Sequence, residues 1–239
     1  FYGIYPSHLL DGQDRDAAMK DGYEWSGGPW KIKEWAKGSS VTLIPNENYW
    51  GQKPYLDSVV FNFVPETAAE VEAYKSGQVA GIYPQAQLEL ADLKTLPDTK
   101  FDVTSSLSYE ALWINTTKEP VNSKAVREAL AYATDRDAAV QTLFGPVQPD
   151  IKPIQSFSTP ANKQWYSEPF KKYKRDLTKV DELMKGDGWA KGSDGIWAKN
   201  GKAAAVTINS TTDNKRRELT EQIIQQQAKT AGFDVKIQN

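Results

Sequence analysis

The sequence contains no cysteine and one histidine, His8. The absence of cysteine excludes disulfides and thiolate metal sites within this chain, and it leaves the redox compartment open. Because the chain has no cysteine and one histidine, it can form few of the nucleophile–base pairs that most hydrolases use. A lone histidine is more often structural than catalytic, so we expect a structural role for His8.

Long apolar runs and an excess of one charge are also missing. No apolar run reaches the roughly 18 residues that a membrane-spanning helix needs. The 29 basic and 31 acidic residues leave a net charge of −2, without the basic stripe of a nucleic-acid-binding domain. Neither GxxxxGK[ST] nor a GxGxxG after a strand occurs, and no His, Asp and Glu cluster has metal-ligand spacing. We therefore expect no nucleic-acid partner, no cofactor and no metal site.

The residues that are present suit a globular protein with a substantial core. Hydrophobic residues make up 39% and charged residues 25% of the 239 residues, which is an ordinary balance for such a protein. Eight tryptophans and eleven tyrosines are many for this length. Such aromatic residues suit a peptide or carbohydrate binder, but they also fill ordinary cores.

Periodicity and turn residues predict alternating strands and helices, and therefore an α/β protein. Prolines at 146, 149, 153 and 160 predict a long irregular connection after Phe144. We expect a hairpin around Lys37-Gly38 with strands at residues 30–36 and 40–45. Further strands are predicted at 59–64, 79–83, 100–106, 107–114, 203–209 and 233–237. Helices are predicted at 14–20, 67–74, 86–96, 125–133, 134–144 and 176–185, and after the capping residues 210–213 as far as Gly232.

Several motifs follow one another along the chain. The longest comprises Trp113-Ile114-Asn115-Thr116, Pro120, Ala125-Val126-Arg127, Ala129-Leu130-Ala131-Tyr132-Ala133 and Asp135-Arg136. The others are Gly28-Pro29-Trp30 with Glu34-Trp35, Asn46-Glu47-Asn48-Tyr49-Trp50, and Tyr74-Lys75-Ser76-Gly77-Gln78-Val79. Together these motifs resemble those of the family 5 extracellular solute-binding proteins, the oligopeptide-, dipeptide- and nickel-binding components of ABC importers. The sequence departs from the family pattern at residues 186–189, and Ser123 stands where the family usually has an aspartate.

The resemblance implies a periplasmic-binding-protein-like fold of type II, with parts of two lobes whose mixed sheets are flanked by helices. Residues 1–108 are then expected in lobe I, as a hairpin and strand–helix–strand units. Residues 109–239 are expected in the large second lobe. Because members of the family are longer, we expect this chain to be a central fragment. Members are extracytoplasmic, in the periplasm or as cell-surface lipoproteins, so a membrane contact is expected only through a lipid anchor outside this fragment.

The resemblance also implies the function. A short peptide or other small solute would be captured between the lobes, whose closure buries it, and delivered to the ABC transporter permease subunits. The residues expected to line the ligand site are Tyr109, Glu110, Trp113, Asn115, Gln85, Phe144 and Lys215. Lys215 matches a ligand-facing position of the family and could hold an acidic group. It begins Lys215-Arg216-Arg217, three cations that are mildly unfavourable at the positive end of a helix, as can occur at functional sites.

Other interpretations stay open at this point. The same fold could bind an oligosaccharide through stacked tryptophans, or nickel or haem. The 31 acidic residues also permit a secreted glycoside hydrolase with a carboxylate pair. Asp187 and Asp194 among glycines suggest a calcium loop, but the spacing and terminal glutamate of an EF-hand are absent, and a glycine-rich turn explains the same residues. We favour the binding protein, which is not an enzyme.

Overall fold

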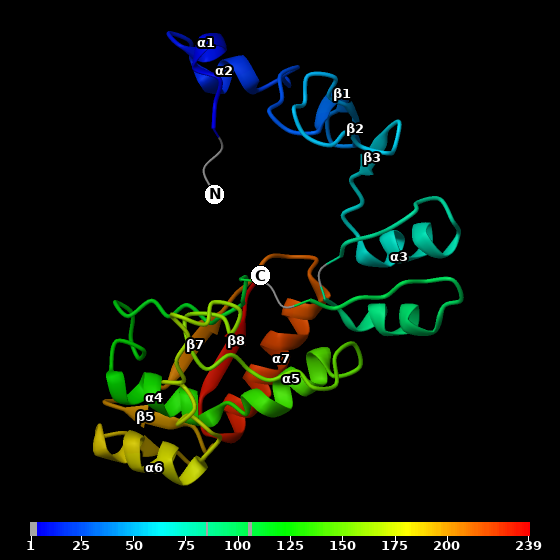
Figure 1. Ribbon diagram of the computed structural model, residues 1–239. Helices are drawn as coiled ribbons and strands as arrows, with labels where there is room; N and C mark the ends of the chain where they lie inside the picture. The colour runs from blue at the N-terminus through cyan, green and yellow to red at the C-terminus, as the bar shows by residue number, and fades with distance from the viewer. Residues whose placement is uncertain (1–3, 85, 105–106) are drawn as a thin grey trace. The chain divides into compact units, whose positions relative to one another are not determined.

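The computed structural model describes residues 4–84, 86–104 and 107–239 (Figure 1). The chain divides into two compact units, Phe1–Ile82 and Tyr83–Asn239, and each contains both helices and strands. The predicted α/β class is confirmed. The lobe boundary at residue 108 concerns the lobes of a longer protein and stays a prediction.

The first unit contains a three-stranded antiparallel sheet in the order β1-β2-β3. β1 spans Trp30–Ala36, β2 spans Ser40–Pro45 and β3 spans Val59–Asn62. Gly38, with φ +76°, turns the chain between β1 and β2, in a backbone region that favours glycine. The predicted hairpin is confirmed, and the third strand ends before the predicted residue 64.

Short helices flank this sheet in sequence: α1 (Ser7–Leu10), α2 (Arg15–Met19) and α3 (Thr67–Lys75). The Asp14 carboxylate accepts hydrogen bonds from the backbone N–H groups of Asp16 at 3.0 Å and Ala17 at 3.2 Å. These bonds satisfy N–H groups that the first helical turn leaves unpaired, which is why α2 begins there. Gly77, with φ +75°, follows the end of α3 as expected.

Asn46 connects two of the sequence motifs. Its side chain is buried, and its amide donates to the backbone carbonyl oxygens of Ser26 and Gly28, both at 2.9 Å. Its Oδ1 accepts from the N–H of Asn48 at 3.1 Å. Asn46 therefore fixes the glycine turn before β1 against the loop after β2.

The second unit is built on four α-helices of the described chain: α4 (Lys124–Ala133), α5 (Arg136–Phe144), α6 (Leu177–Gly186) and α7 (Lys215–Thr230). α4 packs on α6, and α5 packs on α7 (Figure 1). Asp135, Asp176 and Asn214 cap α5, α6 and α7. The four helices were predicted, with starts that differ by a few residues at most, because caps and apolar spacing are local signals.

Short strands complete the second unit. β4 (Ala190–Lys191), β5 (Trp197–Lys199) and β6 (Lys202–Ala203) form an antiparallel sheet. β7 (Ala205–Ile208) and β8 (Asp234–Ile237) pair in parallel, joined by α7. A parallel pair needs such a crossover connection.

One apolar core joins α4, α6 and α7 with β5 and β8. The fully buried side chains Trp197 and Phe233 belong to it, and the Trp197 Nε1–H donates to the carbonyl oxygen of Ala231 at 2.8 Å. Gly232, with φ +95°, lies against them, and a Cβ there would come within 2.9 Å of both the Trp197 ring and the Gly195 carbonyl oxygen. The close approach and the positive φ both require glycine at this position.

The irregular connection between α5 and α6 is present as predicted. Arg136, the last residue of the longest motif, holds it in place. Its guanidinium donates to the carbonyl oxygens of Ile154 at 3.0 Å and Phe170 at 2.8 Å and to the Gln155 side chain at 2.9 Å. Burial lowers the pKa of Arg136 from its ordinary value.

Three predicted strands are wrong wherever the structure describes them. Residues 79–83, 100–104 and 107–114 form no strand, and residues 105–106 lie outside the described part. A strand needs a neighbouring strand to pair with, and alternation alone does not supply one. The predicted helix at 86–96 is a 3₁₀-helix, η1 (Leu88–Thr95).

Candidate functional site

Glu110 and the first turn of α7 form a cluster of charged groups in the second unit. One carboxylate oxygen of Glu110, Oε1, accepts hydrogen bonds from Arg216 Nη2 at 2.6 Å and from Arg217 Nε at 3.0 Å. More than 100 residues separate the partners in sequence. The fold thus places Glu110, a predicted site residue, in contact with Arg216 and Arg217, which were not among the predicted site residues. We call Glu110, Arg216 and Arg217, with Phe144, the arginine cluster.

Arg216 is the deeper of the two arginines. Its side chain is 11% exposed, against 33% for Arg217 and 44% for Glu110. Its guanidinium lies 5.8 Å from the centre of the Phe144 ring, at the end of α5, which gives a cation–π contact. Burial lowers the pKa of Arg216, and the charge of Glu110 opposes that effect. Phe144, also a predicted site residue, therefore contacts the cluster through its aromatic ring.

Arg217 is fixed by groups just before α7. Its Nη1 donates to the Thr211 hydroxyl at 2.6 Å, and its backbone N–H donates to the Asn214 side chain, the N-cap, at 3.1 Å. Two planar guanidinium groups with fixed partners suit the recognition of a carboxylate. The cluster offers cations that bind an anion, and the arrangement presents no nucleophile with a base.

Lys215 lies on the same turn but outside the cluster. Its side chain is 72% exposed, and its ammonium pairs with Glu218 at 3.0 Å on α7 itself. On a helix, consecutive residues point about 100° apart, so only some of three adjacent cations can face Glu110. The sequence marks this turn by its unusual positive charge, and that signal could have identified Arg216 and Arg217.

The other predicted residues lie apart from these contacts. Trp113 is 78% exposed, and Tyr109 is half-buried. The Asn115 side chain accepts from Thr117 N–H at 3.1 Å and from the Thr117 hydroxyl at 2.7 Å, so it stabilises its own turn. Gln85 lies outside the described residues. A ligand role for these four residues stays a prediction.

The suggested calcium loop is not supported. Asp187 Oδ2 accepts from the Ser123 hydroxyl at 2.9 Å and from Trp189 Nε1 at 3.0 Å, so protein donors already surround it. Asp194 Oδ1 accepts from the N–H of Ile196 at 3.0 Å and shapes a turn. Within the described residues, no group of three or more His, Cys, Asp or Glu side chains could hold a metal ion. In that same part of the chain, no helix is both long and apolar enough to cross a bilayer.

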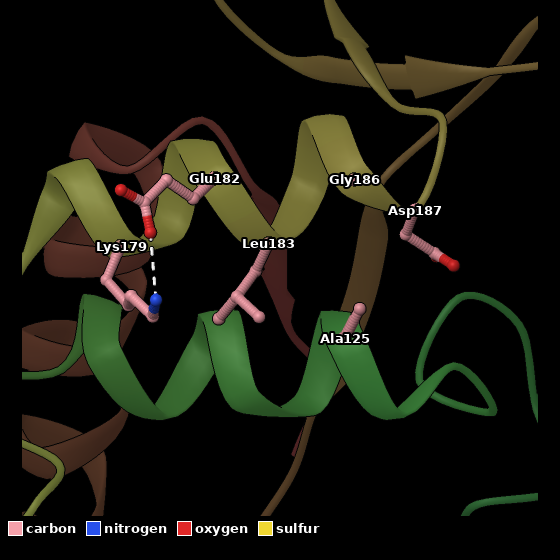
Figure 2. Close-up of a pocket in the computed structure, with 6 residues that line it drawn as sticks. All are labelled: Ala125, Lys179, Glu182, Leu183, Gly186 and Asp187. Carbon is pink, nitrogen blue, oxygen red and sulfur yellow. Dashed lines mark hydrogen bonds and ion pairs between the residues drawn. The ribbon is translucent and has the colours of Figure 1, made fainter.

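A shallow groove of about 340 Å³ lies between α4 and α6 (Figure 2). In Figure 2, Leu183 points from α6 towards α4, and the Lys179–Glu182 ion pair of 2.8 Å lies at one end. The groove is lined by Ala125, Lys179, Glu182, Leu183, Gly186 and Asp187. It contains none of the predicted site residues. Lys179 pairs with Glu182, and Asp187 accepts from Ser123 and Trp189, so we do not assign the groove a ligand.

Comparison with known proteins covers nearly the whole chain. The family model described as bacterial extracellular solute-binding proteins, family 5 Middle, matches residues 2–239. The oligopeptide-binding protein AppA of Bacillus subtilis (strain 168) is 30% identical over 213 residues, which are 88% of this chain and 38% of that protein. The nickel-binding periplasmic protein of Escherichia coli (strain K12) is 26% identical over 216 residues, 88% of this chain and 40% of that protein.

The fold matches as well. A solved structure of lactococcal OppA, complexed with an endogenous peptide in the closed conformation, superposes with a TM-score of 0.78 at 25% identity. The superposition covers 100% of this chain and 47% of that one. The chain thus spans less than half of the length of these relatives.

Proposed function

The chain belongs to the bacterial extracellular solute-binding proteins of family 5, and we propose that it forms part of the solute-binding component of an ABC importer for short peptides. The protein would work outside the cytoplasmic membrane, in the periplasm or anchored as a lipoprotein, and would deliver its cargo to permease subunits. The similarity to an oligopeptide-binding protein supports the choice of cargo.

The observation that carries the proposal within this chain is the arginine cluster. A free peptide ends in a carboxylate, and paired guanidinium groups bind carboxylates well. Arg216 and Arg217 come from the turn that contains Lys215, the residue expected to face the ligand, and Glu110 and Phe144 complete the same cluster. We therefore place the acidic end of the solute here.

The mechanism would be closure of two lobes around the solute. A ligand that contacts both lobes binds the closed state more tightly than the open state, and that difference shifts the equilibrium to closure. The exposed Trp113 would supply an aromatic wall, and Tyr109, Asn115, Gln85 and Lys215 would supply polar contacts to the peptide backbone.

Nickel is the second candidate cargo, because a nickel-binding protein is among the relatives. Direct coordination by this chain lacks a ligand cluster among the described residues. A metal chelate whose carboxylates contact Arg216 and Arg217 fits the structure better than a bare ion. An oligosaccharide would instead use exposed aromatic side chains such as Trp113. The oligopeptide-binding and nickel-binding relatives named above are binding proteins, so we place the enzymatic alternative last.

Isothermal titration calorimetry on the purified protein tests the proposal. The probes are a mixture of di- to pentapeptides, Ni²⁺ alone, nickel citrate and a maltose oligosaccharide series. Binding of peptides only is the expected result. Binding of a nickel form or a sugar only would keep the family and overturn the cargo.

Trp113→Ala tests the wall at the level of one residue. Because Trp113 is 78% exposed, its removal should weaken peptide binding at least about fivefold, as expected for loss of about 1 kcal/mol of aromatic contact, with an unchanged circular dichroism spectrum. Trp165→Ala is the matched control, because Trp165 is 68% exposed on the irregular connection. Equal affinities for the two variants would remove Trp113 from the site.

A further inference from the structure

We propose that Arg216 and Arg217 form a carboxylate-binding site whose resident anion is Glu110, and that the carboxylate of the solute takes the place of Glu110. The inference rests on the proposed function and deepens it, because it names the group within the chain that the solute must displace. It also gives Glu110 a different role from the ligand contact expected from the sequence: Glu110 would compete with the ligand.

The first argument is the need of Arg216 for an anion. A charged group that is largely buried is costly unless it is paired. The Arg216 side chain is 11% exposed, and Glu110 lies 2.6 Å from its Nη2. Departure of Glu110 is therefore costly unless another anion takes its place, which favours the exchange of one carboxylate for another.

The second argument is the difference in exposure between the partners. Each guanidinium group also has a partner other than Glu110. Arg216 lies 5.8 Å from the centre of the Phe144 ring, and Arg217 donates to the Thr211 hydroxyl at 2.6 Å. Glu110 is 44% exposed and is the outermost of the three charged groups. A solute that arrives from solvent meets the anion first and leaves the arginines in place.

The third argument is the backbone that carries each partner. The arginines lie in the first turn of α7, whose N-cap Asn214 bonds the N–H of Arg217 at 3.1 Å. Glu110 belongs to residues 107–114, which form no helix or strand. No backbone ladder has to break when the Glu110 side chain rotates away, whereas movement of an arginine would disturb the helix start.

The binding geometry itself is reproducible by a ligand. Glu110 uses one oxygen, Oε1, for both arginines, through Arg216 Nη2 and Arg217 Nε. A peptide C-terminus carries the same planar carboxylate and can accept from both groups in the same way. A peptide amide lacks the charge and cannot replace the Glu110 anion.

The test compares Glu110→Gln with the unmodified protein. The probes are trialanine with a free C-terminal carboxylate, trialanine amide, and citrate, and affinities are measured by isothermal titration calorimetry. Removal of the competing anion should tighten binding of the acid peptide about fivefold, which corresponds to the upper range of a partly exposed ion pair. The affinity for the amide should not change.

Glu182→Gln is the matched control. Glu182 pairs with Lys179 at 2.8 Å on α6, so this variant removes one negative charge from the second unit without touching the arginine cluster or Lys215. It should change the affinity for the acid peptide less than twofold. An equal gain in both variants would mean that net charge alone is responsible and would overturn the proposal.

Other outcomes separate this proposal from the proposed function. Peptide binding that is weaker in Glu110→Gln, or a gain that is equal for acid and amide, overturns the exchange of carboxylates and leaves peptide binding intact. A folded protein that binds neither peptide overturns the peptide function. In that case a higher affinity of Glu110→Gln for citrate still supports carboxylate exchange, and an unchanged citrate affinity overturns it.

Discussion

Replacing Arg136 by lysine should loosen the long connection between α5 and α6. Three hydrogen bonds of 2.8–3.0 Å leave the Arg136 guanidinium towards Ile154, Gln155 and Phe170. A lysine ammonium at the same place can keep about one of them. Because a hydrogen bond to a charged group contributes about 1.5–3 kcal/mol when it is well buried, and less when partly exposed, the loss should be about 2 kcal/mol.

Arg127→Lys is the control for this substitution. Arg127 is also partly buried, but a single nitrogen, Nη1, donates to the carbonyl oxygens of Val121 and Asn122, both at 2.9 Å. One ammonium can reproduce that arrangement, so the loss should stay below about 1 kcal/mol.

Hydrogen exchange followed by mass spectrometry measures the effect where it arises. The backbone N–H of Phe170 donates to the carbonyl oxygen of Gln155 at 3.0 Å within the connection. A loss of about 2 kcal/mol should speed its exchange about 30-fold in Arg136→Lys. Equal protection of the Phe170 peptide in both variants would refute the view that Arg136 holds the connection.

Two further predictions concern the core and its edge. Gly232→Ala should lower the free energy of unfolding in urea by about 3 kcal/mol, because of the positive φ and a steric clash. Gly201→Ala, at φ +75° with open space around it, should lower it by only about 1 kcal/mol. Similar losses in the two variants would contradict the clash. Burial works to raise the pKa of Asp187, but Ser123, Trp189 and Lys199 outweigh it and hold the pKa below the usual 3.8. The charge of Asp187 should therefore stabilise the fold above about pH 4 and cease to do so as pH falls through the lowered pKa. The urea unfolding curves of Asp187→Asn and of the unmodified protein should then differ at pH 6 and converge near pH 2. A difference that stays constant with pH would contradict this prediction.

Much of the fold could be predicted from sequence because its signals are local. Asp14 and Asp176 mark helix starts through hydrogen bonds to N–H groups within three residues. Gly38 and Gly77 mark turns through their own φ. The strands predicted at 79–83 and 107–114 were wrong because pairing depends on a second segment, which alternation does not identify.

The candidate site was predictable only in part, for a related reason. The positive charge of residues 215–217 identified the turn. Which of these cations contact Glu110 and Phe144 depends on the packing of α5 and on the position of Glu110. Ser123 and Asp187 illustrate the same point: the two departures from the family pattern meet in one hydrogen bond of 2.9 Å. That contact spans 64 residues of sequence, and no local pattern predicts it.

Native mass spectrometry of the protein, purified gently from its own cells, tests the central claim most directly. A series of bound species separated by amino-acid mass differences is the expected result, and it should disappear after partial unfolding and refolding in the absence of peptide. A bound species of hexose multiples or of a metal chelate would contradict the peptide cargo. If the protein carries no solute and also fails to bind peptides from an added mixture, that result would contradict the binding function itself.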